Sequence, residues 1–113
     1  MIKKEPEPIV LSGMDREIVL RALDERRMIQ LVYGVGKLRT VQPHAIIRKG
    51  DGAELLQVFQ VRGQSDKGAE HGWKHFAVAR VSAVELLPET FEPRRDFQPA
   101  SSASGQVVAQ VRR

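Results

Sequence analysis

The stretch Met28–Arg62, MIQLVYGVGKLRTVQPHAIIRKGDGAELLQVFQVR, decides the fold of this chain. It holds three apolar runs rich in β-branched and aromatic residues, separated by two short segments that contain glycine. Such runs are typical of strands, and the glycine segments are typical of turns. The predicted strands cover residues 28–33, 38–48 and 54–62, the turns cover 34–37 and 49–52, and the middle strand is interrupted at Pro43.

The residues on either side of this stretch complete the prediction. After a polar loop at Gln64–Gly72, the segments Lys74–Val81 and Ala83–Leu87 predict two further strands, which makes five. Before it, Met14 to about Arg27 predicts a helix, because apolar residues recur on one side of a helical projection. That apolar side consists of Ile18, Val19, Ala22 and Leu23, and Ser12 with Asp15 forms a capping box at the start.

This order of elements predicts a mainly β fold, a small five-stranded antiparallel barrel with one N-terminal α-helix. Closing such a sheet into a barrel removes exposed strand edges. We expect residues 1–13 to form a flexible N-terminal arm and residues 14–97 to form the single domain. Residues 98–113 are rich in Ser, Ala and Gln and are expected to be disordered.

The composition excludes several classes of protein. The 113 residues include no cysteine, so disulfides and thiolate metal sites are excluded, and a reducing cytoplasm is the expected compartment. The apolar runs are too short for a membrane span, and the opening Met-Ile-Lys-Lys-Glu-Pro lacks the apolar run of a signal peptide. We therefore expect a cytoplasmic protein without a membrane partner.

The basic isoelectric point, about 9.9, does not by itself predict a nucleic-acid partner. Between Met14 and Phe97 there are 14 Lys and Arg against 12 Asp and Glu. The predicted domain is thus nearly balanced, and Arg112 and Arg113 supply much of the remaining positive charge. Any preference for phosphate must come from a local patch rather than from the overall field.

Polar residues gather at the ends of the predicted strands. Along the chain, a leading helix is followed by Leu31–Tyr33, the block Arg39–Ala45 (RTVQPHA), a long strand, Phe76 with Arg80-Val81, and Phe91 with Pro93-Arg94. In this order the features resemble the WYL domain family. Gln60, Gly63, Ser65 and Gly72–Lys74 look like those of short, stand-alone WYL-domain proteins of bacterial or phage type. Where the family has its Trp-Tyr-Leu triplet, this chain has Glu54-Leu55-Leu56.

The resemblance implies an Sm-like barrel that senses a ligand, either a nucleotide or single-stranded nucleic acid, and signals to a separate regulator or effector protein in transcription or defence. The matched positions imply a set of candidate ligand-binding residues: Tyr33, Arg39, His44, Gln60, Ser65, Trp73, Lys74 and Arg80. Arginine can hold a phosphate with two parallel hydrogen bonds, and aromatic rings can stack on bases. His44 can donate to a phosphate, and its charge would respond to pH.

Structural roles are an alternative for each of these side chains. Tyr33 shares a strand face with Ile29 and Leu31, so it can belong to the core, and Trp73 can simply cover the barrel end. Arg39 and Arg80 can equally be structural, and candidate partners for Arg39 are the carboxylates Glu54 and Glu85. His44 follows a proline and can bond to the backbone at a turn.

No catalytic site, metal site or cofactor is predicted, so we do not expect an enzyme. His71 and His75 are four residues apart, but in a loop entering a strand that spacing does not bring two imidazoles to one metal. Gly34–Lys37 lacks the spacing of a phosphate-binding loop. Ser65, Asp66 and His71 lie in one loop without the strained elbow of a nucleophile.

The sequence therefore predicts a ligand-sensing regulatory module in which Arg39, Arg80 and Lys74 engage phosphates while Tyr33 or Trp73 contacts a base. The alternative is a protein-interaction or oligomerisation module without a nucleic-acid ligand, including self-association into a homo-oligomer. Salt separates the two, because phosphate binding weakens steeply as salt rises, whereas an apolar protein interface does not.

Overall fold

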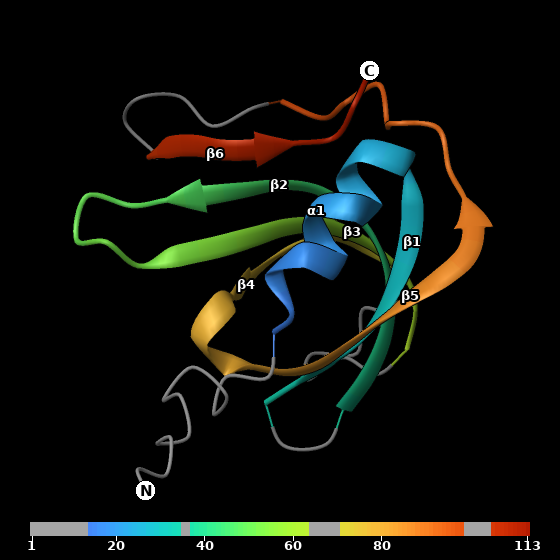
Figure 1. Ribbon diagram of the computed structural model, residues 1–113, viewed down its shortest axis with the longest axis horizontal. Helices are drawn as coiled ribbons and strands as arrows, with labels where there is room; N and C mark the ends of the chain where they lie inside the picture. Colours follow the sequence, from blue (N-terminus) through green and yellow to red (C-terminus); the bar gives the residue numbers. More distant parts are fainter. Residues whose placement is uncertain (1–13, 35–36, 64–70, 99–104) are drawn as a thin grey trace, which may run out of the picture.

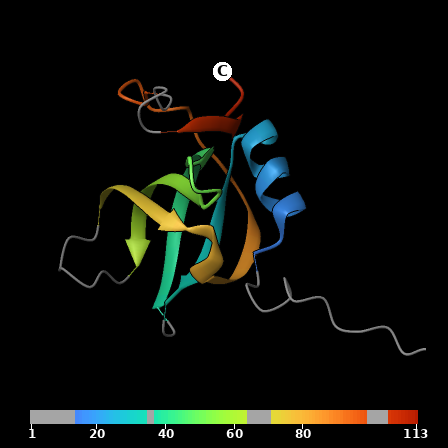
Figure 2. The ribbon, with the colours of Figure 1, turned by 90° about the vertical axis from the view of Figure 1, so that its left-hand side faces the viewer.

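The computed structural model describes residues 14–34, 37–63, 71–98 and 105–113 (Figure 1). One helix packs on a strongly bent antiparallel sheet. The elements are α1 (Arg16–Glu25), β1 (Arg27–Tyr33), β2 (Lys37–Arg48), β3 (Glu54–Gly63), β4 (Gly72–Ala77), the 3-10 helix η2 (Val78–Arg80), β5 (Val81–Thr90) and β6 (Gln106–Gln110). Figure 2 shows α1 lying against one side of the sheet. The expected arm at residues 1–13 lies outside the described residues.

The helix α1 is shorter than its apolar pattern predicts. Asp15 is its N-cap, with the side-chain carboxylate accepting from the backbone N–H groups of Glu17 and Ile18 at 3.0 and 3.3 Å. The predicted capping box with Ser12 at the cap is therefore corrected, and Ser12 itself lies outside the described residues. Arg26 adopts a left-handed conformation with φ 57°, which ends the helix before Arg27.

The strands run in the order β4-β3-β2-β1-β5, each pair antiparallel, and β6 pairs separately with β2. The long strand β2 is therefore shared by three neighbours. Its register shifts between Pro43 and Ala45, a bulge that accommodates a proline without a backbone donor. The end strands β4 and β5 are joined by η2, where one continuous strand had been predicted to reach Val81. The prediction of a mainly β, barrel-like domain with an N-terminal helix is confirmed.

The strand β6 corrects the prediction of disorder after residue 97. Gln106–Gln110 pair with the second half of β2, and Val111 is buried. The backbone N–H of Val111 donates to the carbonyl of His44 at 2.8 Å. Gly105 makes the close approach possible, because it has φ 135° and a Cβ there would lie 2.7 Å from the Arg48 carbonyl oxygen. The folded unit thus extends beyond Phe97, and its sheet has six strands rather than five.

The core lies between α1 and the concave face of the sheet. Val19, Ala22 and Leu23 are buried as the helical pattern predicted, and Ile18 is partly buried against the same cluster. The strands contribute buried side chains of β1, β2, β3 and β4: Ile29, Leu31, Val41, Ile46, Leu56, Val58 and Phe76. Burying a side chain of this size contributes about 1.5–3 kcal/mol, which makes α1 an integral part of the barrel.

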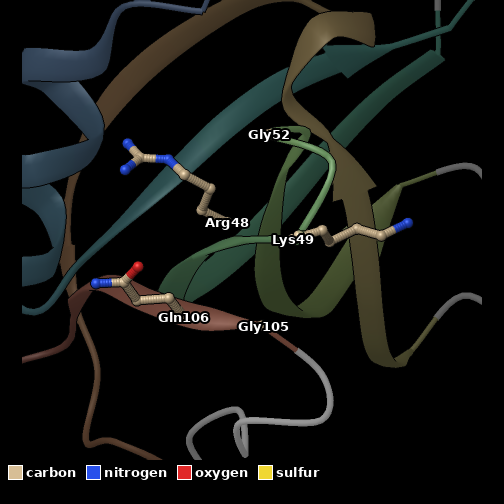
Figure 3. Close-up of a pocket in the computed structure, with 6 residues that line it drawn as sticks. Arg48, Lys49, Gly52, Gly105 and Gln106 are labelled. Carbon is tan, nitrogen blue, oxygen red and sulfur yellow. The ribbon is translucent and has the colours of Figure 1, made fainter.

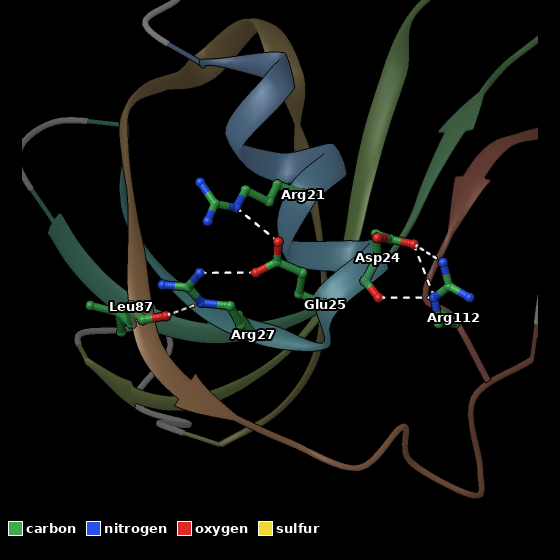
Figure 4. Close-up of polar contacts among 6 residues, drawn as sticks. All are labelled: Arg21, Asp24, Glu25, Arg27, Leu87 and Arg112. Atoms are coloured by element: carbon green, nitrogen blue, oxygen red, sulfur yellow. Dashed lines mark hydrogen bonds and ion pairs between the residues drawn. The ribbon is translucent and has the colours of Figure 1, made fainter.

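Polar contacts fix both ends of α1. At its start, the Glu54 carboxylate forms ion pairs with Arg16 and Arg48, with nitrogen-to-oxygen distances of 2.7 and 2.9 Å. These pairs join the helix to the β2–β3 hairpin. At its end, Asp24 accepts from Nε of Arg112 at 3.0 Å, which joins the helix to the residues after β6 (Figure 4). Because these ion pairs are partly exposed, each contributes about 0–1 kcal/mol and chiefly fixes orientation.

Candidate ligand-binding site

At the end of β1, two arginines that are distant in the sequence lie close to one aromatic ring. Tyr33 ends β1, Arg39 lies near the start of the paired strand β2, and Arg80 lies in η2. The guanidinium carbons of Arg39 and Arg80 lie 5.7 and 5.3 Å from the centroid of the Tyr33 ring. The ring of Phe76 lies 4.4 Å from the same ring, and the backbone N–H of Ala77 donates to Tyr33 Oη at 3.2 Å. Tyr33 is thus hydrogen-bonded through its hydroxyl and lies close to two cations.

Arg39 is a buried cation with 4% of its surface exposed. Its Nη1 donates to Gln60 Oε1 at 3.2 Å, and its guanidinium carbon lies 5.1 Å from the Phe76 centroid. Its Nε is buried without a hydrogen-bond partner. Within the described part of the chain no carboxylate forms an ion pair with Arg39, since Glu54 is engaged by Arg16 and Arg48. A buried charge balanced only by neutral and aromatic groups is costly.

Gln60 and Lys74 lie on the same side of the sheet as this arginine. Gln60 is fully buried and faces Val41 on β2 and Gly72 on β4. Lys74 is half-buried and, because side chains alternate along a strand, shares its face of β4 with Phe76. The structure therefore brings both arginines to Tyr33 and joins Arg39 to Gln60, and Lys74 lies on the same side of the sheet. Ser65 lies outside the described residues.

His44 lies in a different cluster, beneath the segment between β5 and β6. It is fully buried, and its Nδ1 lies 2.9 Å from the carbonyl oxygen of Gln42. Its Nε2 accepts the backbone N–H of Arg94 at 3.1 Å, so the proton of the neutral ring resides on Nδ1 and is donated to Gln42. Both nitrogens are used, and in this state the ring offers no donor to a phosphate.

Aromatic rings enclose the His44 imidazole. The centroids of Trp73, Phe91 and Phe97 lie 4.8, 5.3 and 5.1 Å from it. This burial lowers the pKa of His44 below its ordinary value of 6.5, although the Gln42 carbonyl acts in the opposite direction. The enclosed imidazole is therefore neutral and serves to hold the segment around Arg94 against β2.

Trp73 packs against His44 and not against Tyr33, and we call His44 with Trp73, Phe91 and Phe97 the His44 cluster. Its Nε1 donates to Asp96 at 2.9 Å, and its ring stacks on Phe97 with centroids 6.1 Å apart. Its cross-strand partner Phe59 makes an edge contact at 5.6 Å. Because Trp73 and Phe76 are an odd number of residues apart on β4, they point to opposite faces. Tyr33 and Trp73 therefore do not line one binding site.

A cavity of about 570 Å³ lies beside the β2–β3 turn and the start of β6. Its polar lining includes Arg48, Lys49 and Gln106 (Figure 3). The side chains of Arg48 and Lys49 point in different directions in this view, and Arg48 is bound to Glu54. Because the two cations do not converge, this cavity is a weaker candidate for anion binding than the group of Tyr33, Arg39 and Arg80, which we call the Tyr33 cluster.

Two further features of the described residues bear on function. They contain no group of three or more His, Asp and Glu side chains arranged to hold a metal ion. Their helix falls short of the length and apolar character that crossing a membrane requires.

Comparison with known proteins gives one informative result. No protein-family model matches the sequence, and no curated protein matches it. Among solved structures, the fold is similar to part of "Proteasome accessory factor B/C (PafBC) of Arthrobacter aurescens", with a TM-score of 0.59 and 20% sequence identity. The match covers 74% of this chain and 13% of that chain. At this identity the likeness concerns the fold alone, and it supports the WYL-like fold that the sequence resemblance implies.

Proposed function

We propose that this domain is a ligand-sensing regulatory module that binds a nucleotide or single-stranded nucleic acid at the cluster formed by Tyr33, Arg39 and Arg80. The phosphate groups are contacted by the exposed Arg80, and Lys74 adds positive charge on the same side of the sheet. The half-buried Tyr33 offers its uncovered edge to a base or sugar. Occupancy of the site alters contacts with a separate regulator or effector protein.

The observation that carries this proposal is the burial of Arg39 without a carboxylate partner. A buried guanidinium keeps its charge, and in a medium of low dielectric constant that charge acts strongly on its surroundings. An anion bound beside Tyr33 would supply the missing counter-charge. The cost of burying Arg39 in the free protein is then offset by ligand binding, as expected of a site organised before its ligand arrives.

Regulation through a partner is supported by the fold likeness to part of a proteasome accessory factor. This chain spans 13% of that protein, so the partner, the pathway and the output are all part of the proposal. Transmission would run through η2, because Arg80 lies in that short helix and its carbonyl accepts the Gly34 N–H at 3.2 Å. Ligand contact at Arg80 would thereby reach the connection between β4 and β5.

A protein-interaction module without a nucleic-acid ligand is the second candidate, and one observation favours it. Among the described strands, β4 and β5 are the two ends of the sheet path, and each pairs along one side only. An unpaired strand edge can accept a strand from another protein or from a second copy of the chain. This candidate requires neither Arg39 nor Arg80.

Fluorescence anisotropy with a labelled short oligothymidylate and a labelled adenine nucleotide tests the proposal. We expect saturable binding at about 50 mM salt that weakens steeply by about 200 mM. Arg80→Ala should weaken binding about tenfold, or ~1.4 kcal/mol, because it removes a phosphate contact and leaves the backbone of η2 in place. Lys49→Ala removes the same charge from the exposed β2–β3 turn and is the matched control.

The outcome decides between the two candidates. Equal affinity of Arg80→Ala and Lys49→Ala would place any binding elsewhere on the surface and contradict the proposed site. A lack of saturable binding by the unaltered protein at low salt would favour the protein-interaction module.

A further inference from the structure

The sequence contains three pairs of adjacent arginines, at 26–27, 94–95 and 112–113. The fold brings members of all three pairs to one cavity of about 270 Å³ at the C-terminal end of α1. The cavity is lined by Arg26, Glu92, Pro93, Arg94, Arg95 and Arg113. Four guanidinium groups thus face one carboxylate. We call this cavity the arginine pocket.

The arginines of the pocket are less balanced by carboxylates than the neighbouring arginines Arg21, Arg27 and Arg112. Figure 4 shows Glu25 bound to both Arg21 and Arg27, and Asp24 bound to Arg112. Inside the pocket, the contact between Arg26 and Glu92 spans 3.9 Å, and the Glu92 side chain is 90% exposed, so it neutralises little.

The other three pocket arginines, Arg94, Arg95 and Arg113, form no ion pair with any residue in the described ranges. Their positive charges are therefore left available to an anion from outside the chain.

Two of these arginines are held in place by neutral groups. The guanidinium carbon of Arg94 lies 3.5 Å from the centroid of the Phe59 ring, and its Nη1 donates to Gln42 Oε1 at 3.2 Å. The guanidinium carbon of Arg113 lies 4.9 Å from the Phe97 centroid, and its Nη2 donates to the Phe97 carbonyl at 3.4 Å. Neither contact cancels charge, and each reduces the entropy lost when an anion binds.

We propose that the arginine pocket binds an oligophosphate group, from a nucleotide or from inorganic oligophosphate. Guanidinium forks match the paired oxygens of phosphate, and several linked phosphates supply enough negative charge for four arginines. The pocket is distinct from the Tyr33 cluster: it begins at Arg26, just before β1, whereas Tyr33 ends that strand. At roughly 3.3 Å per residue, the seven residue steps from Arg26 to Tyr33 span at most about 23 Å along the chain, and none of Tyr33, Arg39 and Arg80 lines the pocket. This proposal does not depend on the proposed function.

Titration calorimetry with inorganic tripolyphosphate, ATP and adenosine tests the arginine pocket. The variant Arg26→Gly combined with Arg95→Ala removes two charges at little structural cost, since glycine suits the left-handed backbone of Arg26 and Arg95 is exposed. Its matched control is Lys49→Ala combined with Arg62→Ala, two exposed cations that do not line the pocket. We expect the pocket variant to bind tripolyphosphate at least about tenfold more weakly, and the control to stay within about twofold.

Two further readouts complete the test. In amide NMR spectra, tripolyphosphate should shift the signals of Glu92 and Arg95 in the unaltered protein. Arg80→Ala should leave the tripolyphosphate-induced shifts of the Glu92 and Arg95 signals unchanged, which separates this pocket from the Tyr33 cluster. Equal affinities for ATP and tripolyphosphate would identify the phosphate chain as the recognised group, whereas tighter ATP binding would identify a nucleotide. No saturable tripolyphosphate binding, or equal affinity in the pocket variant and its control, would overturn the proposal.

Discussion

The Tyr33 cluster and the His44 cluster contain the same kinds of side chain and differ in how their polar atoms are paired. Around His44, both imidazole nitrogens and the Trp73 indole N–H have hydrogen-bond partners. Around Tyr33, the buried Arg39 has an unpaired Nε and no carboxylate partner among the residues described. A cluster whose buried polar atoms have hydrogen-bond partners stabilises the fold. A buried polar atom without a partner costs stability, and a ligand can supply the missing partner. Pairing, and not residue type, therefore separates the two candidate sites.

The largest expected effect is a loss of stability when the paired cluster is broken. His44→Ala removes two buried hydrogen bonds and leaves a cavity among three aromatic rings, so the free energy of unfolding should fall by about 3 kcal/mol. Urea denaturation measures this loss. His75→Ala is the matched control, since His75 is exposed on β4 and its removal should cost less than about 0.5 kcal/mol. Equal losses of unfolding free energy in both variants would contradict the structural role of His44.

The second effect concerns the unpaired cluster and should appear in binding rather than in stability. Arg39→Met keeps an unbranched chain of similar length and removes the buried charge, so the free energy of unfolding should change by less than about 1 kcal/mol. Affinity for the labelled oligonucleotide should fall about tenfold or more. Urea denaturation and anisotropy on the same sample separate the two quantities. A large loss of stability with unchanged affinity would make Arg39 a structural residue.

The smallest effect is a pH dependence confined to the His44 cluster. Burial lowers the pKa of folded His44, whereas the unfolded chain takes up a proton near the ordinary value of 6.5. Stability from this group is therefore complete above about pH 6.5 and falls as the pH drops toward the folded pKa. The slope cannot exceed about 1.4 kcal/mol per pH unit, the limit for one proton.

Urea denaturation between about pH 7 and pH 5 measures the slope. We expect it to persist in His75→Ala and to be lost in His44→Ala. Arg94, Asp96 and Arg113 also act on the charge of His44. Glu54 does not interfere, because its two arginine partners lower the pKa of its carboxyl. Its contribution to stability is complete above its ordinary value of 4.5 and is lost only in more acidic solution. A flat profile in the unaltered protein would contradict the enclosure of His44.

The fold could be predicted where local pattern decides it. Period-two alternation and glycine turns predicted β1, β2 and β3 to within a residue or so at each end. The strand β6 was not predicted, because Gln106–Gln110 is short and is stabilised by a remote partner, the second half of β2. Val107 and Val108, two adjacent β-branched residues, were the local signal for a strand. The role of Glu54, which stands where WYL domains have the first residue of their Trp-Tyr pair, could not be predicted either. Its carboxylate pairs with Arg16 and Arg48, and these ion pairs join α1 to the β2–β3 hairpin.

The arrangement of the candidate site could be predicted in part. The sequence resemblance indicated Tyr33, Arg39 and Arg80, and the fold brings these three together. The enclosure of His44 could not be inferred, because its partner N–H and two of its rings come from the segment between β5 and β6.

The arginine pocket was missed although the three arginine pairs were visible in the sequence. Their convergence depends on the end of α1, the segment after β5 and the residues after β6, whose relative placement only the tertiary structure determines. Adjacent arginines recurring at element boundaries were the available signal.

The pairing of β6 with β2 has a consequence for synthesis of the chain. The second half of β2 leaves the ribosome early and can pair at once with β3, but its other edge has no neighbour until Gln106–Gln110 have been made. An open strand edge in a nascent chain is a site for association with other chains. Completion of the last strand therefore ends the period in which the newborn domain is most prone to aggregate.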